Sequence, residues 1–184
     1  MKLETLEEIK EYANICYHSG ALGSKDNQTV AVAKAVVAIQ YGGELGMTPM
    51  QSIKEVQFIS GKPTLSASGH ALLLKKHGRH SYEVAQHTET LCSIVYSKDG
   101  EEIGISSFDT DDANRAGLTR NPMWSKFAKA MLFARAMTQG CRWYCADVFG
   151  GSTYTPDELD EQQAPEAEPL ERLKGLMEAH EEPG

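Results

Sequence analysis

The sequence predicts an α+β domain, in which helices pack on one face of a short antiparallel sheet made of a hairpin plus a three-strand meander. Three observations predict this class. Strand-like segments at 81–87, 90–97 and 101–108 follow one another, and Lys98-Asp99-Gly100 joins the last two as a strong hairpin turn. Segments with helical spacing of apolar residues come before and after them. After Gly150-Gly151 the chain becomes acidic and poor in apolar residues, which indicates a disordered C-terminal tail.

The N-terminal part is expected to be helical. Residues 3–20 carry apolar side chains at helical spacing, and residues 28–43 are apolar nearly all round, which indicates a buried helix. Thr48 followed by Pro49 marks a third helix start, because threonine caps free amides and proline suits the first helical position.

The remaining elements are read from their turn residues. "VQFISGKPTLS" is typical of a short hairpin that turns at Ser60-Gly61-Lys62, and "SASGHALLLKKHG" of a helix that ends at Gly78. After the meander, Thr110-Asp111-Asp112 begins a short helix that ends at Gly117. Asn121-Pro122 then begins a long helix, whose apolar arc would hold Trp124, Phe127, Ala128, Met131 and Leu132.

The 184 residues are long enough for one ordinary domain. We predict a domain over residues 1–156 and a flexible acidic tail over residues 157–184, in which "LERLKGLMEAH" could form a short helix. The chain has no membrane-length apolar run and no signal-peptide core, so a cytoplasmic protein is expected. Its four cysteines are scattered, which favours reduced thiols.

The net charge of −8 is unevenly distributed. The tail after residue 156 holds ten acidic and two basic residues, so the preceding body, with sixteen of each, is neutral. Residues 113–146 hold six basic residues and no acidic one. Such a stretch suits an anionic ligand on one face, although chance clustering over buried and solvated faces explains it equally.

Arg135 projects from the middle of the apolar arc of the long helix. A buried unpaired charge costs several kcal/mol, so we expect a buried ion pair, with Asp147 or with one of Asp109, Asp111 and Asp112. Lys126 and Lys129 lie on another side of the helix and can reach phosphates. Arg142, Trp143 and Tyr144 suit a base-stacking platform, and equally a packed helix end.

Catalytic and metal-binding patterns are weak. His70, His77 and His80 lack zinc-type spacing, and Cys141 and Cys145 are better explained as buried thiols, so no metal site is predicted. Asp109, Asp111 and Asp112 could hold a divalent ion as in nucleases, but their place before a helix favours capping. Hydrolase and nucleotide-binding motifs are absent from the sequence, so we predict neither catalytic residues nor a cofactor.

Two stretches together resemble phage recombinases of the RecT type, the single-strand annealing proteins of the RecT/Redβ superfamily. The first is "ELGMTPMQSIKEVQFISGKPTLSASGHALLLKKHG". The second is "DTDDANRAGLTRNPMWSKFAKAMLFARAMTQGCRWYCADVFGGSTYTPDEL", with an Ala-x-x-Ala-Gly-Leu segment, a Met-Leu-x-x-Arg-Ala core and a late Asp-Val-x-x-Gly-x-x-Tyr. The resemblance covers about residues 28 to 160 and rests on the order and combination of these elements.

The resemblance implies single-stranded DNA binding and ATP-independent annealing of complementary strands in phage recombination. It also implies a homo-oligomeric ring or filament in the bacterial cytoplasm that holds the annealed duplex and works beside a phage exonuclease or a host single-strand-binding protein. In an oligomer, the modest basic stripes of neutral subunits can join into one continuous groove for the phosphate backbone. The residues expected to contact DNA are Lys126, Lys129, Arg120, Arg115, Arg142, Lys75, Lys76 and Trp143.

Two alternatives remain open at this point. The first is a metal-dependent nuclease that uses Asp109, Asp111 and Asp112. The second is an interaction or inhibitor protein whose acidic tail mimics DNA or binds a basic partner.

Overall fold

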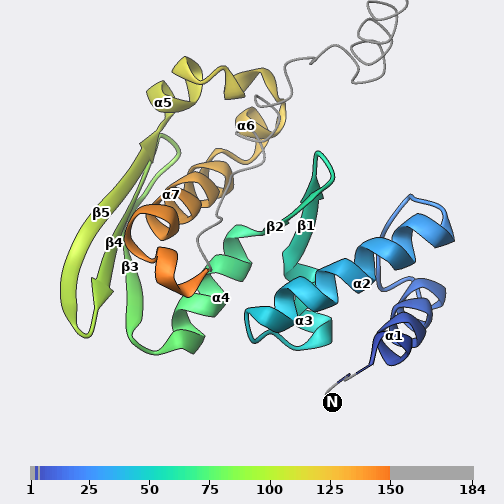
Figure 1. The fold of residues 1–184 in the computed structure, drawn as a ribbon. Helices are drawn as coiled ribbons and strands as arrows, with labels where there is room; N and C mark the ends of the chain where they lie inside the picture. The colour runs from blue at the N-terminus through green and yellow to red at the C-terminus, as the bar shows by residue number, and fades with distance from the viewer. Residues whose placement is uncertain (1–2, 4, 150–184) are drawn as a thin grey trace, which may run out of the picture.

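The computed structural model describes residue 3 and residues 5–149. Its elements are α1 (Leu6–His18), α2 (Gln28–Glu44), α3 (Pro49–Glu55), β1 (Val56–Ile59), β2 (Lys62–Leu65), α4 (Ala67–His77), β3 (His80–His87), β4 (Leu91–Lys98), β5 (Glu101–Asp109), α5 (Thr110–Arg115), η1 (Leu118–Arg120), α6 (Met123–Lys126), α7 (Ala128–Tyr144) and η2 (Ala146–Val148) (Figure 1). This order confirms the predicted α+β class. The predicted acidic tail, 157–184, lies outside the described residues.

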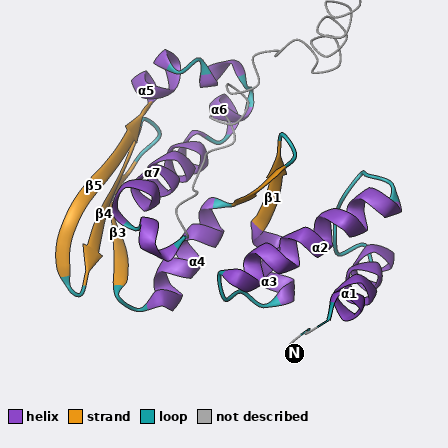
Figure 2. Cartoon of the chain, viewed as in Figure 1, coloured by secondary structure: helices purple, strands orange, loops and turns teal. Residues whose placement is uncertain are grey.

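The strands form two separate antiparallel sheets (Figure 2). β1 and β2 are a hairpin that turns through Ser60 and Gly61, and β3, β4 and β5 are the predicted meander. Asp99 and Gly100 turn the chain between β4 and β5 with positive φ values of 53° and 90°. Asp and Gly tolerate this left-handed backbone, which is why the turn could be predicted from the sequence.

α7 covers one face of the three-stranded sheet, and α4 lies beside it (Figure 1). Strand β4 follows the alternation expected of a half-covered sheet, with Cys92, Ile94 and Tyr96 buried and the residues between them partly exposed. Leu132, Met137 and Cys141 of α7 are fully buried in the same cluster. The main core therefore lies between α7 and the sheet.

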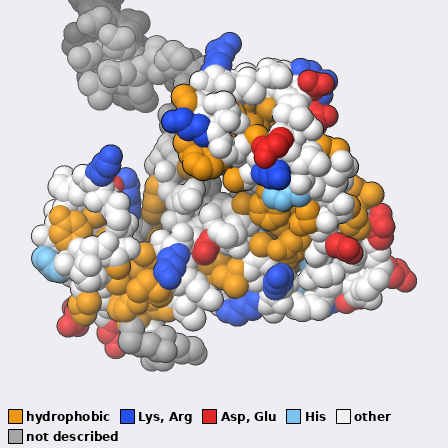
Figure 3. Space-filling view, turned by 180° about the vertical axis from the view of Figure 1, so that it is seen from behind, with side chains coloured by type: hydrophobic (Ala, Val, Ile, Leu, Met, Phe, Trp, Pro, Cys, Tyr) orange, Lys and Arg blue, Asp and Glu red, His pale blue; other side chains and the backbone are white. Residues whose placement is uncertain are grey.

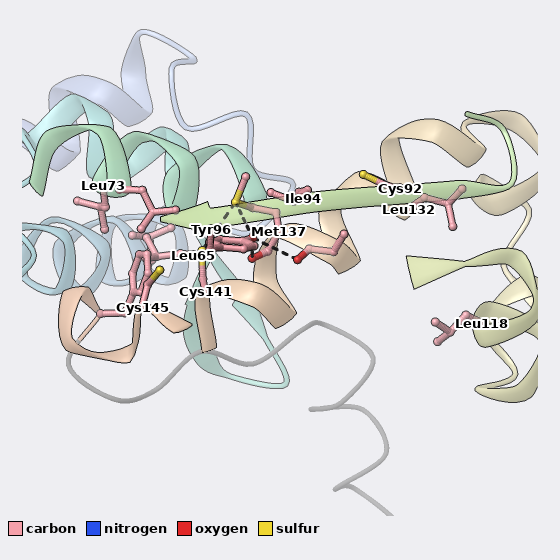
Figure 4. Packing of buried hydrophobic residues seen from close by; sticks show 14 of the residues in the cluster. Leu65, Leu73, Cys92, Ile94, Tyr96, Leu118, Leu132, Met137, Cys141 and Cys145 are labelled. Carbon is pink, nitrogen blue, oxygen red and sulfur yellow. Dashed lines mark hydrogen bonds between the residues drawn. The ribbon is translucent and has the colours of Figure 1, made fainter. Parts of the chain in front are cut away.

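Tyr96 fixes how closely α7 lies on the sheet (Figure 4). Its hydroxyl donates a hydrogen bond to the Met137 carbonyl oxygen at 2.9 Å. Its ring occupies the space above Gly140, where an added Cβ would lie 2.2 Å from the ring. Gly104 on β5 makes room for the ring of Tyr144 in the same way. The helix and the sheet approach closely because these two positions have no side chain.

The N-terminal helices build a smaller second core. Ile9 and Ala13 of α1 pack with Ala35, Val36 and Ile39 of α2. The third helix starts as predicted, because Thr48 and Gln51 form a capping box and Pro49 is the first helical residue. None of the helices in the described part of the chain is long and apolar enough to cross a membrane.

Two helix predictions need correction. The helix over residues 28–43 was expected to be buried, but one of its sides is exposed to solvent, with Val30 39% and Val37 41% exposed. The expected long helix after Asn121-Pro122 is broken at Phe127, whose backbone (φ −137°, ψ 46°) is not helical and separates α6 from α7. As a result Trp124 is buried against Phe108, whereas Phe127 is 55% exposed and does not belong to the apolar arc.

Candidate nucleic-acid surface

Four of the predicted basic residues gather at one end of the three-stranded sheet. There the chain leaves β5 and passes through α5, η1 and α6 into α7 (Figure 1). Arg115 ends α5, Arg120 ends η1, Lys126 ends α6, and Lys129 lies in the first turn of α7. We call these four residues, together with the exposed Met123 and Phe127, the α5–α7 corner.

The cationic groups of the corner reach solvent. Lys126 and Arg120 are exposed. Arg115 forms an ion pair with Asp112, and its side chain is 75% exposed. The Lys129 ammonium lies 3.7 Å from a carboxylate oxygen of Glu89, a long and solvent-exposed contact. Because exposed pairs of this kind contribute little, they can be exchanged for phosphate contacts at low cost.

Apolar side chains stand among these cations. Phe127 lies between Lys126 and Lys129 in sequence, and Met123, 44% exposed, precedes it on α6. The break at Phe127 turns its ring out of the core while the buried Trp124 holds α6 in place. Sequence reasoning missed Phe127 as a surface residue, because a continuous helix would place it beside Met131.

The other four predicted contacts lie at the opposite end of the sheet. Lys75 and Lys76 stand in the last turn of α4, with Lys75 over the Tyr82 ring at 5.8 Å and Lys76 bonded to the Gly46 carbonyl oxygen. Arg142 and Trp143 end α7, and Trp143 is 54% exposed. Lys129 and Trp143 are separated by fourteen helical residues, about 21 Å. The eight predicted residues therefore form two groups.

The basic side chains do not merge into one large patch on the face drawn in Figure 3. There, Lys and Arg side chains occupy separate places, with apolar and neutral surface between them. This distribution fits the neutral charge of the body.

The expected ion pair of Arg135 with Asp147 is not formed. The Arg135 guanidinium lies over the Phe108 ring at 5.9 Å, whereas Asp147 binds Lys98 at 2.9 Å. Phe108 pairs with Cys92 and Lys98 with Glu101, so the two sites are about 20 Å apart along β4. The contact with Lys98 lowers the pKa of Asp147.

The carboxylates before α5 act as a helix cap. The Asp109 side chain accepts from the Asp112 backbone amide at 2.7 Å, and Asp112 accepts from the Asp109 amide in return. Asp112 also pairs with Arg115. This confirms the capping interpretation, and it leaves Asp111 as the exposed carboxylate of the three. Within the described residues, no three His, Cys, Asp or Glu side chains are grouped to hold a metal ion.

The two cysteines at the C-terminal end of α7 are buried, as predicted. Cys141 and Cys145 have no exposed surface, and burial raises the pKa of Cys145 to about 11 and that of Cys141 further. Both are therefore protonated thiols near neutral pH.

His70 lies in the core rather than on a solvated helix face. Its ring packs on Phe149, with centroids 4.9 Å apart, and Nδ1 lies 2.8 Å from the Ser66 carbonyl oxygen. Burial lowers its pKa to about 4.

The principal hollows lie on the N-terminal helices, away from the α5–α7 corner. The largest of those described, about 880 Å³, is lined by residues of α1, of α2 and of the loop into α3, including Ile9, Ile39 and Met47. A second, about 220 Å³, lies between α2 and β1 with the Asp26–Lys34 ion pair in its wall. Neither contains a pair of groups arranged for acid–base or nucleophilic chemistry.

Comparison with known proteins adds no relative. No protein-family model, no curated protein and no solved structure matches the chain.

Proposed function

We propose that the protein binds single-stranded DNA without sequence preference and, as an oligomer, anneals complementary strands without ATP. The observation that carries the proposal is Phe127, an aromatic side chain that is 55% exposed between two exposed lysines. Proteins that bind single strands combine cations for phosphates with aromatic rings for base stacking. The α5–α7 corner supplies both.

The charge pattern supports a nucleic-acid ligand at the corner. No acidic residue occurs between Ala113 and Ala146, so α6 and α7 carry no carboxylate that would repel a phosphate. The resemblance to RecT-type proteins includes this stretch and supports annealing as the activity. In this proposal the protein is not an enzyme, and an exonuclease or a single-strand-binding protein is a partner rather than a part of the chain.

A neutral body makes oligomerisation a necessary part of the proposal. One corner offers four cations, which is a small electrostatic footprint for a single subunit. A ring or filament that places corners side by side would form a continuous track for the backbone of the strand. Such an assembly binds long strands more tightly than short ones, because each added subunit contributes its contacts.

The test compares binding, annealing and degradation in one set of samples. Labelled oligonucleotides of two unrelated sequences and of increasing length are mixed with the full chain, with and without Mg²⁺. We expect salt-sensitive, length-dependent binding of both sequences, faster annealing of complements without ATP, and intact DNA. Degradation in Mg²⁺ would favour the nuclease instead, and absence of binding at low salt would refute the proposal.

A further inference from the structure

The turn between α4 and β3 brings two imidazole rings together. His77 ends α4, Gly78 takes a left-handed backbone (φ 80°), and His80 begins β3. The Nδ1 atoms of the two histidines are 3.4 Å apart, and their ring centroids are 5.2 Å apart. His77 is exposed, whereas His80 is only 2% exposed. One ring is therefore held firmly and the other is open to solvent.

These two distances match a pair of metal ligands. Nitrogen ligands lie about 2.0–2.1 Å from a tetrahedral zinc ion, so two imidazoles at the tetrahedral angle have nitrogens about 3.4 Å and centroids about 5.2 Å apart. The same separation also allows a hydrogen bond between the two rings when one Nδ1 carries a proton, so the two Nδ1 atoms face each other across the gap.

The far side of His80 faces a carboxylate, as the outer nitrogen of a metal-binding histidine commonly does. Its Nε2 lies 3.4 Å from Asp147 Oδ1, while the other oxygen of Asp147 accepts from Lys98 at 2.9 Å. A carboxylate at Nε2 favours the tautomer that carries its proton there and leaves the Nδ1 lone pair free.

The two cations beside His80 are paired. Lys98 is paired with Asp147, and Arg79 is paired with Asp99 at 2.6 Å. These pairs reduce the repulsion that a bound cation would meet there, whereas Lys75 and Lys76 stand in the same helix turn as His77.

We propose that His77 Nδ1 and His80 Nδ1 form a two-ligand site for a late first-row divalent ion such as Zn²⁺, with water in the remaining coordination positions. Imidazole suits such ions, whereas Mg²⁺ prefers oxygen ligands. The sequence spacing did not predict this site, because the two rings meet only through the left-handed turn at Gly78. The site shares no residue with the α5–α7 corner, so it can be confirmed or refuted independently of the proposed function.

The test uses the untagged full chain, zinc chloride and the nitrogen resonances of ¹⁵N-labelled histidine side chains. We expect one zinc ion per chain by calorimetry and large shifts at Nδ1 of His77 and His80. His77→Ala should weaken zinc binding at least tenfold, whereas the matched control His18→Ala, which removes another exposed helix-terminal histidine, should not change it. Asp147→Asn should weaken zinc binding about 10- to 100-fold, because the supporting carboxylate is lost.

Three results would overturn the proposal. They are no zinc binding by the unaltered chain at millimolar zinc, unchanged affinity in His77→Ala, and a zinc-induced shift at Nε2 of His80 instead of Nδ1. The first would leave the short contact between the rings as a packing feature. The third would move the ion to Asp147.

Discussion

Tyr96 and Gly140 together determine the spacing between the sheet and α7. The ring of Tyr96 is fully buried, and its hydroxyl is satisfied by the Met137 carbonyl oxygen. Because the space above Gly140 is filled by that ring, the position tolerates no side chain without displacing β4 or α7.

Gly140→Ala should therefore destabilise the fold. We expect the free energy of unfolding to fall by about 1–3 kcal/mol, because an added methyl group overpacks a filled core. Gly43→Ala is the control, since a Cβ there meets nothing within 4 Å. It should leave stability unchanged or raise it by up to about 1 kcal/mol, because alanine favours helix. Urea unfolding of both variants measures the difference. Equal stability of the two would mean that Tyr96 does not set the helix position.

His70 should make stability depend on pH. Its folded pKa of about 4 lies below the ordinary histidine value of about 6.5, so folding favours the neutral ring. This contribution is complete above about pH 6.5 and is lost as the pH falls toward 4. As this contribution is lost, we expect the free energy of unfolding to fall by about 2 kcal/mol between pH 7.5 and pH 5.

Urea unfolding of the unaltered chain and of His70→Asn at both pH values isolates this contribution, since asparagine can still donate to Ser66 but does not titrate. The difference in unfolding free energy between the two pH values should be smaller in the variant. If both proteins lose the same amount, other groups carry the pH dependence.

The break between α6 and α7 is the element on which the candidate surface depends. A continuous helix would bury Phe127 beside Met131, and the corner would then hold cations alone. The break turns one aromatic inward, Trp124, and the other outward, Phe127.

Substitution of these two aromatics tests the break. Trp124→Ala should cost about 3–5 kcal/mol of unfolding free energy, as for other buried aromatics. Phe127→Ala should change stability by less than about 0.5 kcal/mol, because surface substitutions rarely do more. It should weaken single-strand binding by about 1–3 kcal/mol for each base that the ring stacks. A large loss of stability in Phe127→Ala, measured by thermal unfolding, would show that the ring is packed in solution.

The predictable elements are those whose start and stop signals are local. The turn at Asp99-Gly100, the cap at Thr48 and the end of α4 at Gly78 follow from the conformations of their own residues. The break at Phe127 has no local signal in the sequence, and in the structure it accompanies the packing of Trp124 against Phe108. The partner of Asp147 has no local signal either, because Lys98 of β4 and Asp147 of η2 meet only in the tertiary structure.

The candidate site was predictable in part. Lys126, Lys129, Arg115 and Arg120 were identified from a run without acidic residues, and the structure brings them to one end of the sheet. Charge in the sequence does not say at which end of a helix or sheet each cation lies. Lys75, Lys76, Arg142 and Trp143 therefore joined the list although they lie at the other end.

For the molecule as a whole, charge is divided between a neutral body and a strongly acidic C-terminal segment. If the chain binds DNA as proposed, a tethered segment with a charge of −8 would compete with the strand for the same cations at high effective concentration. Ending the chain at Tyr154 should tighten single-strand binding at low salt, and the gain should fade as salt screens both interactions. Binding isotherms at 50 and 300 mM salt measure this effect. Loss of a protein partner without any gain in DNA binding would identify the segment as a docking element instead.

The central claim is that the α5–α7 corner, and not the opposite end of the sheet, binds the backbone of a single strand. The most direct measurement is the salt dependence of oligonucleotide affinity for two matched double variants, Lys126→Ala with Lys129→Ala and Lys75→Ala with Lys76→Ala. Each lost phosphate contact on a single strand reduces the slope of log affinity against log salt by about 0.7. The first variant should therefore flatten the slope by up to about 1.4 on every sequence alike, and the second should leave it unchanged. An unchanged slope in the first variant, with normal folding, or a flattened slope in the second would contradict the account.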